Sequence, residues 1–258
     1  MVNDIFLNKV YSSSYPFTRK INKKIFGDYM EKIIEHLKDK KTFKILDVGC
    51  GTGQFTSLLS NYFDYKELEV EIDGVDSSPE MLKVAEELTR NDRNIKLIES
   101  DILSFKPKQK YDLIFSSEMI HLVDDTQEFF ERLNNLISMD GVIAIRTSTH
   151  KQLYEREWYK YFPGTLLIDI TRHKSSYEIK ATLESLGFIL KQYEIDESEQ
   201  INSREYLNIF ENRSYSTLRL IPDSIYYESL NKLRKEVLKT DTVIKDYKMT
   251  LYIAGKEI

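Results

Sequence analysis

The chain has 258 residues, of which 41% are hydrophobic and 31% charged, and its formal net charge at pH 7 is −5. This length accommodates one large α/β domain, and the acidic balance disfavours a nucleic-acid substrate, which usually requires a basic face. No apolar run is long enough for a membrane span, residues 1–20 lack the apolar region of a secretory signal, and a single cysteine, Cys50, excludes an internal disulfide. We therefore expect a cytoplasmic protein with no membrane segment.

The first predicted element is an amphipathic helix over residues 18–38. Its apolar residues recur at helical spacing, as expected for a helix with one face packed on a core: Ile21, Ile25, Met30, Ile33, Ile34 and Leu37. An arm with the sequence Tyr-Ser-Ser-Ser-Tyr-Pro precedes it at residues 11–16. Residues 1–40 are therefore predicted to form an N-terminal arm and helix.

A glycine-rich turn follows the first predicted strand. The apolar run at 45–48 passes into Asp-Val-Gly-Cys-Gly-Thr-Gly at 47–53, and a helix-competent segment comes next. Such a turn lets the backbone approach a ligand, and the helix start offers free N–H groups to it. A nicotinamide-binding turn would need a third glycine where Gln54 or Thr56 stands, and a P-loop would need a Gly-Lys-Ser/Thr ending that is missing.

Four more strand-like segments follow, and polar residues come after the first three of them. The predicted strands cover residues 70–75, 95–98, 111–116 and 142–146, the last entered by a turn at 139–141. The polar residues are Asp76 and Ser77, then Asp101, then Ser117. Alternating strands and helices imply a parallel sheet covered on both faces, whose ligands bind outside the carboxyl ends of the strands. Asp76 is placed there to accept hydrogen bonds from both ribose hydroxyls of a nucleoside.

These segments resemble the motifs of the class I S-adenosylmethionine-dependent methyltransferases. Asp-x-Gly-x-Gly-x-Gly at 47–53 resembles motif I, Asp-x-Ser-x-x-Met-Leu at 76–82 resembles motif II, and Tyr-Asp-Leu-Ile-Phe-Ser at 111–116 resembles motif IV. The resemblance implies S-adenosyl-L-methionine as cofactor, held by Tyr15, Asp47, Gly49, Cys50, Gly51, Gln54, Asp76, Ser77, Met81, Asp101, Ile102 and Ser117.

The resemblance also implies individual roles for these residues. Asp47 would serve the cationic end of the cofactor, Asp76 its ribose, and Asp101 the exocyclic amine of its adenine, while the backbone N–H of Ile102 would touch the ring. Tyr15 belongs to an arm that is similar to the Tyr-Arg-Pro-x-Tyr-Pro entry of small-molecule members, which folds over the cofactor; here two serines replace the Arg-Pro pair.

The fold that the resemblance implies is α/β, a doubly wound, Rossmann-like, seven-stranded and mostly parallel sheet. Its last strand, predicted at 247–254, would run antiparallel between the fifth strand and a sixth at 188–195. The whole of 1–258 is interpreted as a single methyltransferase domain with its cofactor-binding core at 43–147.

Two segments, 148–173 and 197–246, exceed what this fold requires. Both are rich in aromatic and charged residues, and long excursions at the ligand face of a sheet are usually lids or partner surfaces. We expect helical, aromatic lids over a small-molecule pocket, with oligomer contacts as the alternative. The sequence leaves monomer and homodimer open.

His121 is the candidate catalytic residue, as a general base for an acceptor that must lose a proton. It lies in a loop after the fourth strand that is similar to a His-aromatic-x-Asp loop of the family, although Leu122 takes the aromatic position, and a capping or packing role stays open. Glu118 is a candidate for holding a cationic amine or for capping the next helix. No His/Cys cluster has metal-ligand spacing, so no metal is expected.

Three functions remain open on these grounds. The first is methyl transfer by in-line displacement to a nitrogen or oxygen of a small organic acceptor. The second is methylation of a tRNA or a protein side chain, of which tRNA fits the acidic charge poorly. The third is a non-catalytic subunit that binds the cofactor and regulates a partner.

Overall fold

The computed structural model describes residues 22–245 and 247–256. They form a seven-stranded sheet in the order β3-β2-β1-β4-β5-β9-β6. Its strands are β1 (Thr42–Val48), β2 (Glu69–Asp76), β3 (Ile95–Glu99), β4 (Tyr111–Ser117), β5 (Ile137–Thr147), β6 (Ile189–Asp196) and β9 (Lys248–Gly255). The strands from β3 to β5 pair in parallel, and β9 pairs antiparallel with both β5 and β6. The predicted fold class, including the inserted last strand, is confirmed.

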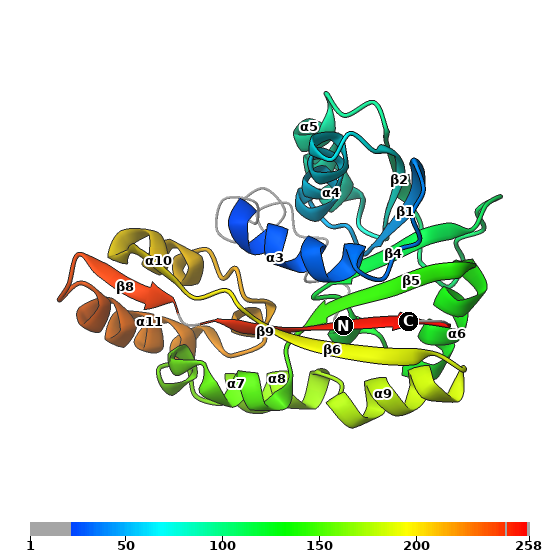
Figure 1. The fold of residues 1–258 in the computed structure, drawn as a ribbon. Coiled ribbons are helices and arrows are strands. Elements are labelled where there is room, and N and C mark those ends of the chain that lie inside the picture. Colours follow the sequence, from blue (N-terminus) through cyan, green and yellow to red (C-terminus); the bar gives the residue numbers. More distant parts are fainter. Residues whose placement is uncertain (1–21, 246, 257–258) are drawn as a thin grey trace.

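Helices cover both faces of the sheet (Figure 1). One face carries α3 (Lys23–Ile34), α4 (Gln54–Tyr65) and α5 (Pro79–Thr89), and the other carries α6 (Thr126–Leu136) and α9 (Ser176–Ser185). Two buried hydrophobic clusters correspond to these faces, one containing Leu59 of α4 and the other Leu133 of α6. Strands covered on both sides contain continuous apolar runs, which explains Leu113–Phe115 in β4 and Val142–Ile145 in β5.

The helix starts carry the signals that the sequence contained. Ser78 accepts a hydrogen bond from the backbone N–H of Met81 at 3.2 Å, and Pro79 begins α5. Asp125 caps α6 in the same way through the N–H of Glu128 at 3.0 Å. Caps of this kind satisfy N–H groups that have no partner within the helix.

The fifth strand begins earlier than predicted. Residues 139–141 belong to β5 rather than to a turn, and the register between β4 and β5 shifts between Tyr111 and Leu113. A Cβ on Gly141 would lie only 2.8 Å from the Tyr111 carbonyl oxygen. Because Gly141 has no Cβ, β4 and β5 can approach each other closely at this irregularity. The dipeptide Asp140-Gly141 is also typical of a turn, which explains the prediction.

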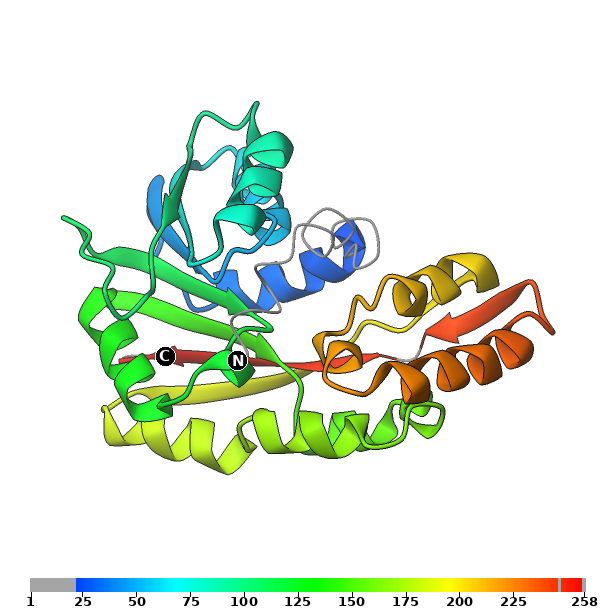
Figure 2. The ribbon, with the colours of Figure 1, turned by 180° about the vertical axis from the view of Figure 1, so that it is seen from behind.

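The two excursions pack against each other beside the sheet. Segment 148–173 forms α7 (His150–Glu155), the 3-10 helix η2 (Glu157–Lys160) and α8 (Thr165–Arg172). Segment 197–246 forms β7 (Glu199–Asn202), α10 (Ser203–Glu211), η3 (Ser216–Arg219), α11 (Asp223–Val237) and β8 (Thr242–Lys245). The β7–α10–α11–β8 unit extends beyond the end of the main sheet at which β9 begins (Figures 1 and 2).

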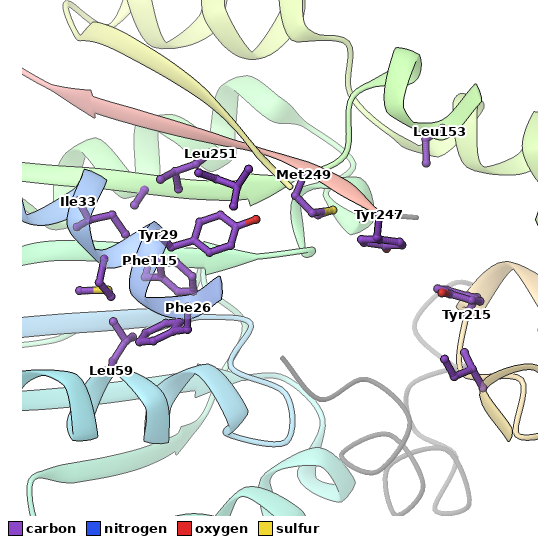
Figure 3. Close-up of a cluster of buried hydrophobic side chains, with 14 of the residues drawn as sticks. Phe26, Tyr29, Ile33, Leu59, Phe115, Leu153, Tyr215, Tyr247, Met249 and Leu251 are labelled. Carbon is purple, nitrogen blue, oxygen red and sulfur yellow. The ribbon is translucent and has the colours of Figure 1, made fainter. Parts of the chain in front are cut away.

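Aromatic rings join these parts. Trp158 of η2 stacks on Tyr215 with ring centroids 4.9 Å apart, and Phe162 stacks on Phe210 of α10 at 5.5 Å. In Figure 3, Tyr29 projects from α3 towards β9, and Tyr215 and Tyr247 mark the continuation of the same cluster towards the excursion. The core of the sheet thus runs without interruption into the added unit. Within the described residues, no helix combines the length and the apolar character needed to cross a bilayer.

Candidate functional site

The glycine turn between β1 and α4 is shaped by backbone conformations that favour glycine. Gly49, Gly51 and Gly53 all have positive φ. A Cβ on Gly49 would lie 2.5 Å from Cγ of Met119, and one on Gly53 would lie 2.9 Å from Cβ of Ala85. The turn is therefore packed tightly on its protein side.

Asp76 projects from the end of β2 onto this turn. Its carboxylate accepts hydrogen bonds from the backbone N–H of Gly51 at 2.8 Å and of Ser78 at 2.8 Å. Burial raises the pKa of Asp76, and these N–H groups oppose the rise. The two bonds fix the direction of a carboxylate that borders on open space.

Asp47, at the end of β1, is buried and also borders on this space. Its carboxylate accepts a hydrogen bond from Oγ1 of Thr56 at 2.6 Å. The pKa of Asp47 is raised to about 7, chiefly by burial and also by the negative charge of Asp76, while the hydrogen bond from Thr56 opposes the rise. A cation placed against the two carboxylates would reverse this effect and favour their ionised forms.

A cavity of about 750 Å³ opens at the carboxyl ends of the parallel strands. Every predicted cofactor-binding residue that the structure describes lines it: Asp47, Gly49, Cys50, Gly51, Gln54, Asp76, Ser77, Met81, Asp101, Ile102 and Ser117. Tyr15 lies outside the described residues. The volume is typical of sites for small organic ligands.

The same cavity continues to a second set of side chains. These come from α3, α4, the end of β5, the second excursion and the residue before β9: Ile25, Phe55, Arg146, Glu197, Glu199, Tyr215, Lys245 and Tyr247. No residue of 148–173 lines the cavity; that excursion instead supports Tyr215 through Trp158. The cavity thus has a cofactor-like end at the glycine turn and a second end bounded by aromatic and charged groups.

A buried ion pair forms part of the second end. Arg146 donates to both carboxylate oxygens of Glu197, from Nε at 2.7 Å and from Nη2 at 2.6 Å. Its Nη1 donates to Oγ of Ser117 at 3.0 Å, and the hydroxyl of Tyr29 donates to Glu197 at 2.5 Å. Fork-on-carboxylate geometry of this kind holds both groups rigidly. It links β4, β5, α3 and the start of the excursion.

Glu118 occupies the loop after β4 with a positive φ of 53°. Glu118 is half-buried, and desolvation would raise the pKa of its carboxylate, but the nearby His121, Arg146, Arg156 and His173 lower that pKa to about 2. Glu118 therefore stays ionised on the cavity wall at neutral pH. An ionised carboxylate with so low a pKa is a poor general base.

His121 lies in the 3-10 helix η1 (Ile120–Leu122) and is not among the residues that line the cavity. Its ring stacks on that of His173 with centroids 4.6 Å apart. His173 is in turn fixed by a 2.8 Å hydrogen bond between its Nδ1 and the carbonyl oxygen of Asp169. The arrangement places the His121 ring next to Glu118 and α8, and its catalytic role stays a prediction.

Several residues of the second end were not singled out from the sequence. Arg146 carried a usable signal, because it is a charged residue that ends an otherwise apolar strand. Glu199 and Lys245 carried none, since they meet through the pairing of β7 with β8, two strands of four residues each. Segments so short have no distinguishing periodicity. Glu197 carried none either, since it lies between β6 and β7 and meets Arg146 of β5 only in the fold.

Comparisons with known proteins identify the family. A family model described as "Methyltransferase domain" matches residues 39–211. The chain is 36% identical over 116 residues to malonyl-[acyl-carrier protein] O-methyltransferase 1 of Ilyobacter polytropus, covering 45% of this chain and 42% of that one. It is 32% identical over 125 residues to trans-aconitate 2-methyltransferase of Escherichia fergusonii, covering 46% and 47%. The matched stretches span less than half the length of these relatives.

Solved structures share the fold. The YcgJ protein of Bacillus subtilis matches with a TM-score of 0.62 at 15% identity, covering 90% of this chain and all of that one. Phosphoethanolamine N-methyltransferase 2 of Haemonchus contortus, solved with S-adenosyl-L-methionine, matches with a TM-score of 0.56 at 16% identity, covering 96% of this chain and 57% of that one.

The fold, the glycine turn and the family match together define the class. The chain belongs to the methyltransferase domain family, among the class I S-adenosylmethionine-dependent methyltransferases. The residues fit the family's cofactor: a buried carboxylate, Asp47, borders the cavity beside the glycine turn, and a second, Asp76, is oriented by backbone amides. No group of three or more His, Cys, Asp or Glu side chains in the described part of the chain is arranged to hold a metal ion.

Proposed function

We propose that this protein transfers a methyl group from S-adenosyl-L-methionine to a nitrogen or oxygen of a small organic acceptor. The observation that carries the proposal is a single cavity of about 750 Å³ that begins at the glycine turn and ends at Tyr215, Tyr247 and the Arg146–Glu197 pair. A cofactor and an acceptor need a shared, enclosed space, because methyl transfer depends on alignment and on exclusion of water.

The cofactor end is assigned as follows. Asp76 would accept hydrogen bonds from the ribose hydroxyls, Asp47 would face the cationic amino group, and Asp101 and Ile102 would contact the adenine. Bound there, S-adenosyl-L-methionine supplies a methyl group already activated by a positively charged sulfur. The protein's contribution is to bind both partners, hold them in line and keep water out.

The acceptor end has a rigid wall. The Arg146–Glu197 pair is held by Ser117 and Tyr29, and Phe55 lies beside Arg146 with its ring centroid 5.3 Å from the guanidinium carbon. Because Ser117 also borders the cofactor end, the pair connects the two halves of the cavity. We propose that the Arg146–Glu197 pair holds the acceptor-side wall of the cavity in a fixed position relative to the glycine turn.

The relatives' names cover both acceptor atoms. One is named for O-methylation of malonyl-[acyl-carrier protein] and another for methylation of trans-aconitate, whereas a structural neighbour is named for N-methylation of phosphoethanolamine. Their matches support the reaction class and leave the acceptor of this chain to experiment. A cytoplasmic location, inferred from the lone Cys50, stays a prediction.

The test is turnover with a panel of small amines, alcohols, phenols and carboxylic acids. The purified protein is incubated with S-adenosyl-L-methionine and each acceptor, and S-adenosylhomocysteine and the methylated product are quantified by mass spectrometry. We expect a product that grows with enzyme concentration and is lost in Asp76→Ala. Cofactor binding without turnover of any small acceptor, together with capture and methylation of an RNA or a protein, would contradict the proposal.

A further inference from the structure

The acceptor end of the cavity carries charges of both signs in its wall. Among the described residues, its carboxylates belong to Glu118, Glu197 and Glu199, and the cations on this wall or directly behind it are Arg146, Arg156 and Lys245. Three other lining acids, Asp47, Asp76 and Asp101, lie at the cofactor end. The charge that an acceptor meets therefore depends on how the six groups of the acceptor end are arranged among themselves.

Two of these carboxylates each bind a lining cation directly. Arg146 donates from Nε and Nη2 to the two carboxylate oxygens of Glu197, at 2.7 and 2.6 Å. Lys245 donates from Nζ to Oε1 of Glu199 at 3.1 Å, and the two residues are register partners across β7 and β8. Each pair therefore presents little net charge to a ligand.

Glu118, the third carboxylate, is engaged by groups of the protein itself. The positive charges of Arg146 and Arg156 act on it, and Oγ of Ser148 donates to its carboxylate at 3.4 Å. The guanidinium of Arg156 also donates to Ser148, and its carbon lies 3.9 Å from the ring centroid of Tyr247, behind the cavity wall. A cationic acceptor would have to compete with two guanidinium groups for this carboxylate.

The remaining acids of the lining lie where α6 begins. Asp124, Asp125 and Glu128 are exposed, so water and salt screen their charges. The same helix is joined to the assigned adenine end by Arg132, whose Nε donates to the carbonyl oxygen of Ile102 at 3.2 Å. These three acids therefore do not define the acceptor end.

The uncharged side chains of the acceptor end are apolar or aromatic. Ile25 of α3 and Phe55 of α4 line it, together with Tyr215 and Tyr247. The half-buried ring of Phe55 packs on that of Phe115, with centroids 5.3 Å apart. Such a lining favours apolar parts of a ligand. A charged ligand would lose its hydration there, because the charges of the described wall already have partners of opposite sign.

We propose that the acceptor is an uncharged, largely apolar molecule, because the charged side chains of the acceptor end compensate one another and the rest of its described lining is apolar or aromatic. The atom that receives the methyl group is then a hydroxyl oxygen or a nitrogen that is unprotonated at neutral pH. This inference rests on the proposed function and narrows its acceptor. It separates this chain from the relative named for trans-aconitate, an anion.

The first measurement compares probes that share a skeleton and differ in charge. The uncharged 4-hydroxyphenylacetamide, the anion 4-hydroxyphenylacetate and the cation tyramine are titrated by calorimetry at neutral pH into the full-length protein saturated with S-adenosylhomocysteine. The amide, carboxylate and amine of the 3-phenylpropyl skeleton form a second series. We expect each amide to bind at least about tenfold more tightly than either charged member of its series, with an affinity that changes little with salt.

Two variants each leave one charge of the wall without its partner. Glu199→Gln removes the carboxylate that binds Lys245 and should tighten binding of the anionic probes several-fold. Lys245→Gln removes the cation that binds Glu199 and should tighten binding of the cationic probes instead. Both gains should shrink as salt rises. Affinity for the amides should stay nearly the same in both variants, which would show that the cavity is intact.

Glu228→Gln is the matched control. It removes the carboxylate of an exposed ion pair with Lys232 on α11, and neither residue lines the cavity. Its affinities for all the probes should equal those of the unmodified protein.

The outcomes separate this inference from the function on which it rests. If the protein binds no S-adenosylhomocysteine, the proposed function fails and this inference fails with it. If it binds S-adenosylhomocysteine but takes either charged probe as tightly as the amide, or binds neither amide at millimolar concentration, the uncharged acceptor is overturned and methyl transfer to a charged acceptor remains. Unchanged affinities for the charged probes in both Glu199→Gln and Lys245→Gln would also overturn it.

Discussion

At the scale of single residues, Asp76 is held in place before any ligand arrives. Its two oxygens accept hydrogen bonds from the N–H groups of Gly51 and Ser78, so the carboxylate is already oriented towards the cavity. We expect Asp76→Ala to weaken binding of S-adenosyl-L-methionine by about 1.5–3 kcal/mol, the range for a lost hydrogen bond to a charged group. Isothermal titration calorimetry measures it, and an unchanged affinity would remove Asp76 from the cofactor site.

Asp47 predicts a pH dependence. Burial raises the pKa of its carboxyl to about 7, so below that pH the free protein carries Asp47 largely in neutral form, whereas a cationic ligand favours the ionised form. Cofactor affinity should fall as pH decreases from 8 to 6, by up to about tenfold per pH unit below the pKa. Asp47→Asn should bind more weakly and lose this dependence. A flat pH profile in the unmodified protein would contradict the assignment.

The Asp47 carboxyl also makes the stability of the ligand-free protein depend on pH, but in the opposite direction to cofactor affinity. Because the folded state binds this proton more tightly than the unfolded state, the contribution of Asp47 to stability is largest below the unfolded pKa near 4 and is lost as pH rises towards 7. The ligand-free protein should therefore lose part of its resistance to urea over this interval. The Asp47→Asn variant should lose less of its resistance to urea over the same pH interval.

His121 gives a prediction that separates the two ends of the site. Its ring stacks on His173 and does not line the cavity, so His121→Ala should leave cofactor affinity within about threefold of the original whatever happens to turnover. Calorimetry with S-adenosylhomocysteine tests it. A large loss of affinity would mean that the stacked pair supports the cofactor end through Glu118.

The sequence pointed to many residues that line the cavity at the glycine turn and to few that line its other end, for a physical reason. The Asp47 turn and Asp76 are local features, in which a few consecutive residues determine both the backbone and the ligand-facing groups. Glu197 and Glu199 become part of the site only through contacts with Arg146 and Lys245, residues distant in the chain. Contacts between residues so far apart in the chain produce no recognisable pattern in the local sequence.

At the scale of elements, the Arg146–Glu197 pair ties β5 to the start of the second excursion. Removing one member leaves the other buried without its hydrogen-bonded charge partner, which costs about 3–5 kcal/mol of the free energy of unfolding. We expect this loss for Arg146→Met and for Glu197→Gln measured singly by urea denaturation. The double variant should lose less than the sum, because neither charge is then left alone.

A matched control defines the size of this effect. Glu228→Gln removes the carboxylate of an exposed ion pair on α11 and should leave the unfolding midpoint essentially unchanged. If Arg146→Met behaved like this control, the buried pair would contribute little to the attachment of the excursion.

Element boundaries also show where sequence patterns suffice. The predicted strands at 70–75 and 188–195 match β2 and β6 to within one residue at each end, because both lie between clear turn and helix signals. The predicted turn at 139–141 was wrong, because these residues continue β5 as an irregular stretch where its register with β4 shifts between Tyr111 and Leu113. The pairing of β7 with β8 was not predicted, because strands of four residues are too short to show a recognisable sequence pattern.

At the scale of the whole molecule, one sheet and one added unit enclose a single cavity between them. The parallel strands bring Asp47, Asp76 and Ser117 to one edge, and the excursion places Tyr215 and Lys245 opposite that edge. A ligand that spans both halves should stabilise the entire molecule, by about 2.7 kcal/mol at a concentration one hundred times its Kd. A single, cooperative shift of the thermal transition with S-adenosylhomocysteine would reflect this coupling. Stabilisation of only part of the transition would indicate that the two units unfold separately.

The central claim is that the glycine-turn end of this cavity binds S-adenosyl-L-methionine. Its most direct test is calorimetric titration of the purified protein with S-adenosyl-L-methionine and with S-adenosylhomocysteine, using ATP as a nucleotide that lacks the amino-acid moiety. The account predicts one site per chain with micromolar affinity for both sulfur compounds and no comparable binding of ATP. Absence of binding, or equal binding of ATP, would contradict it.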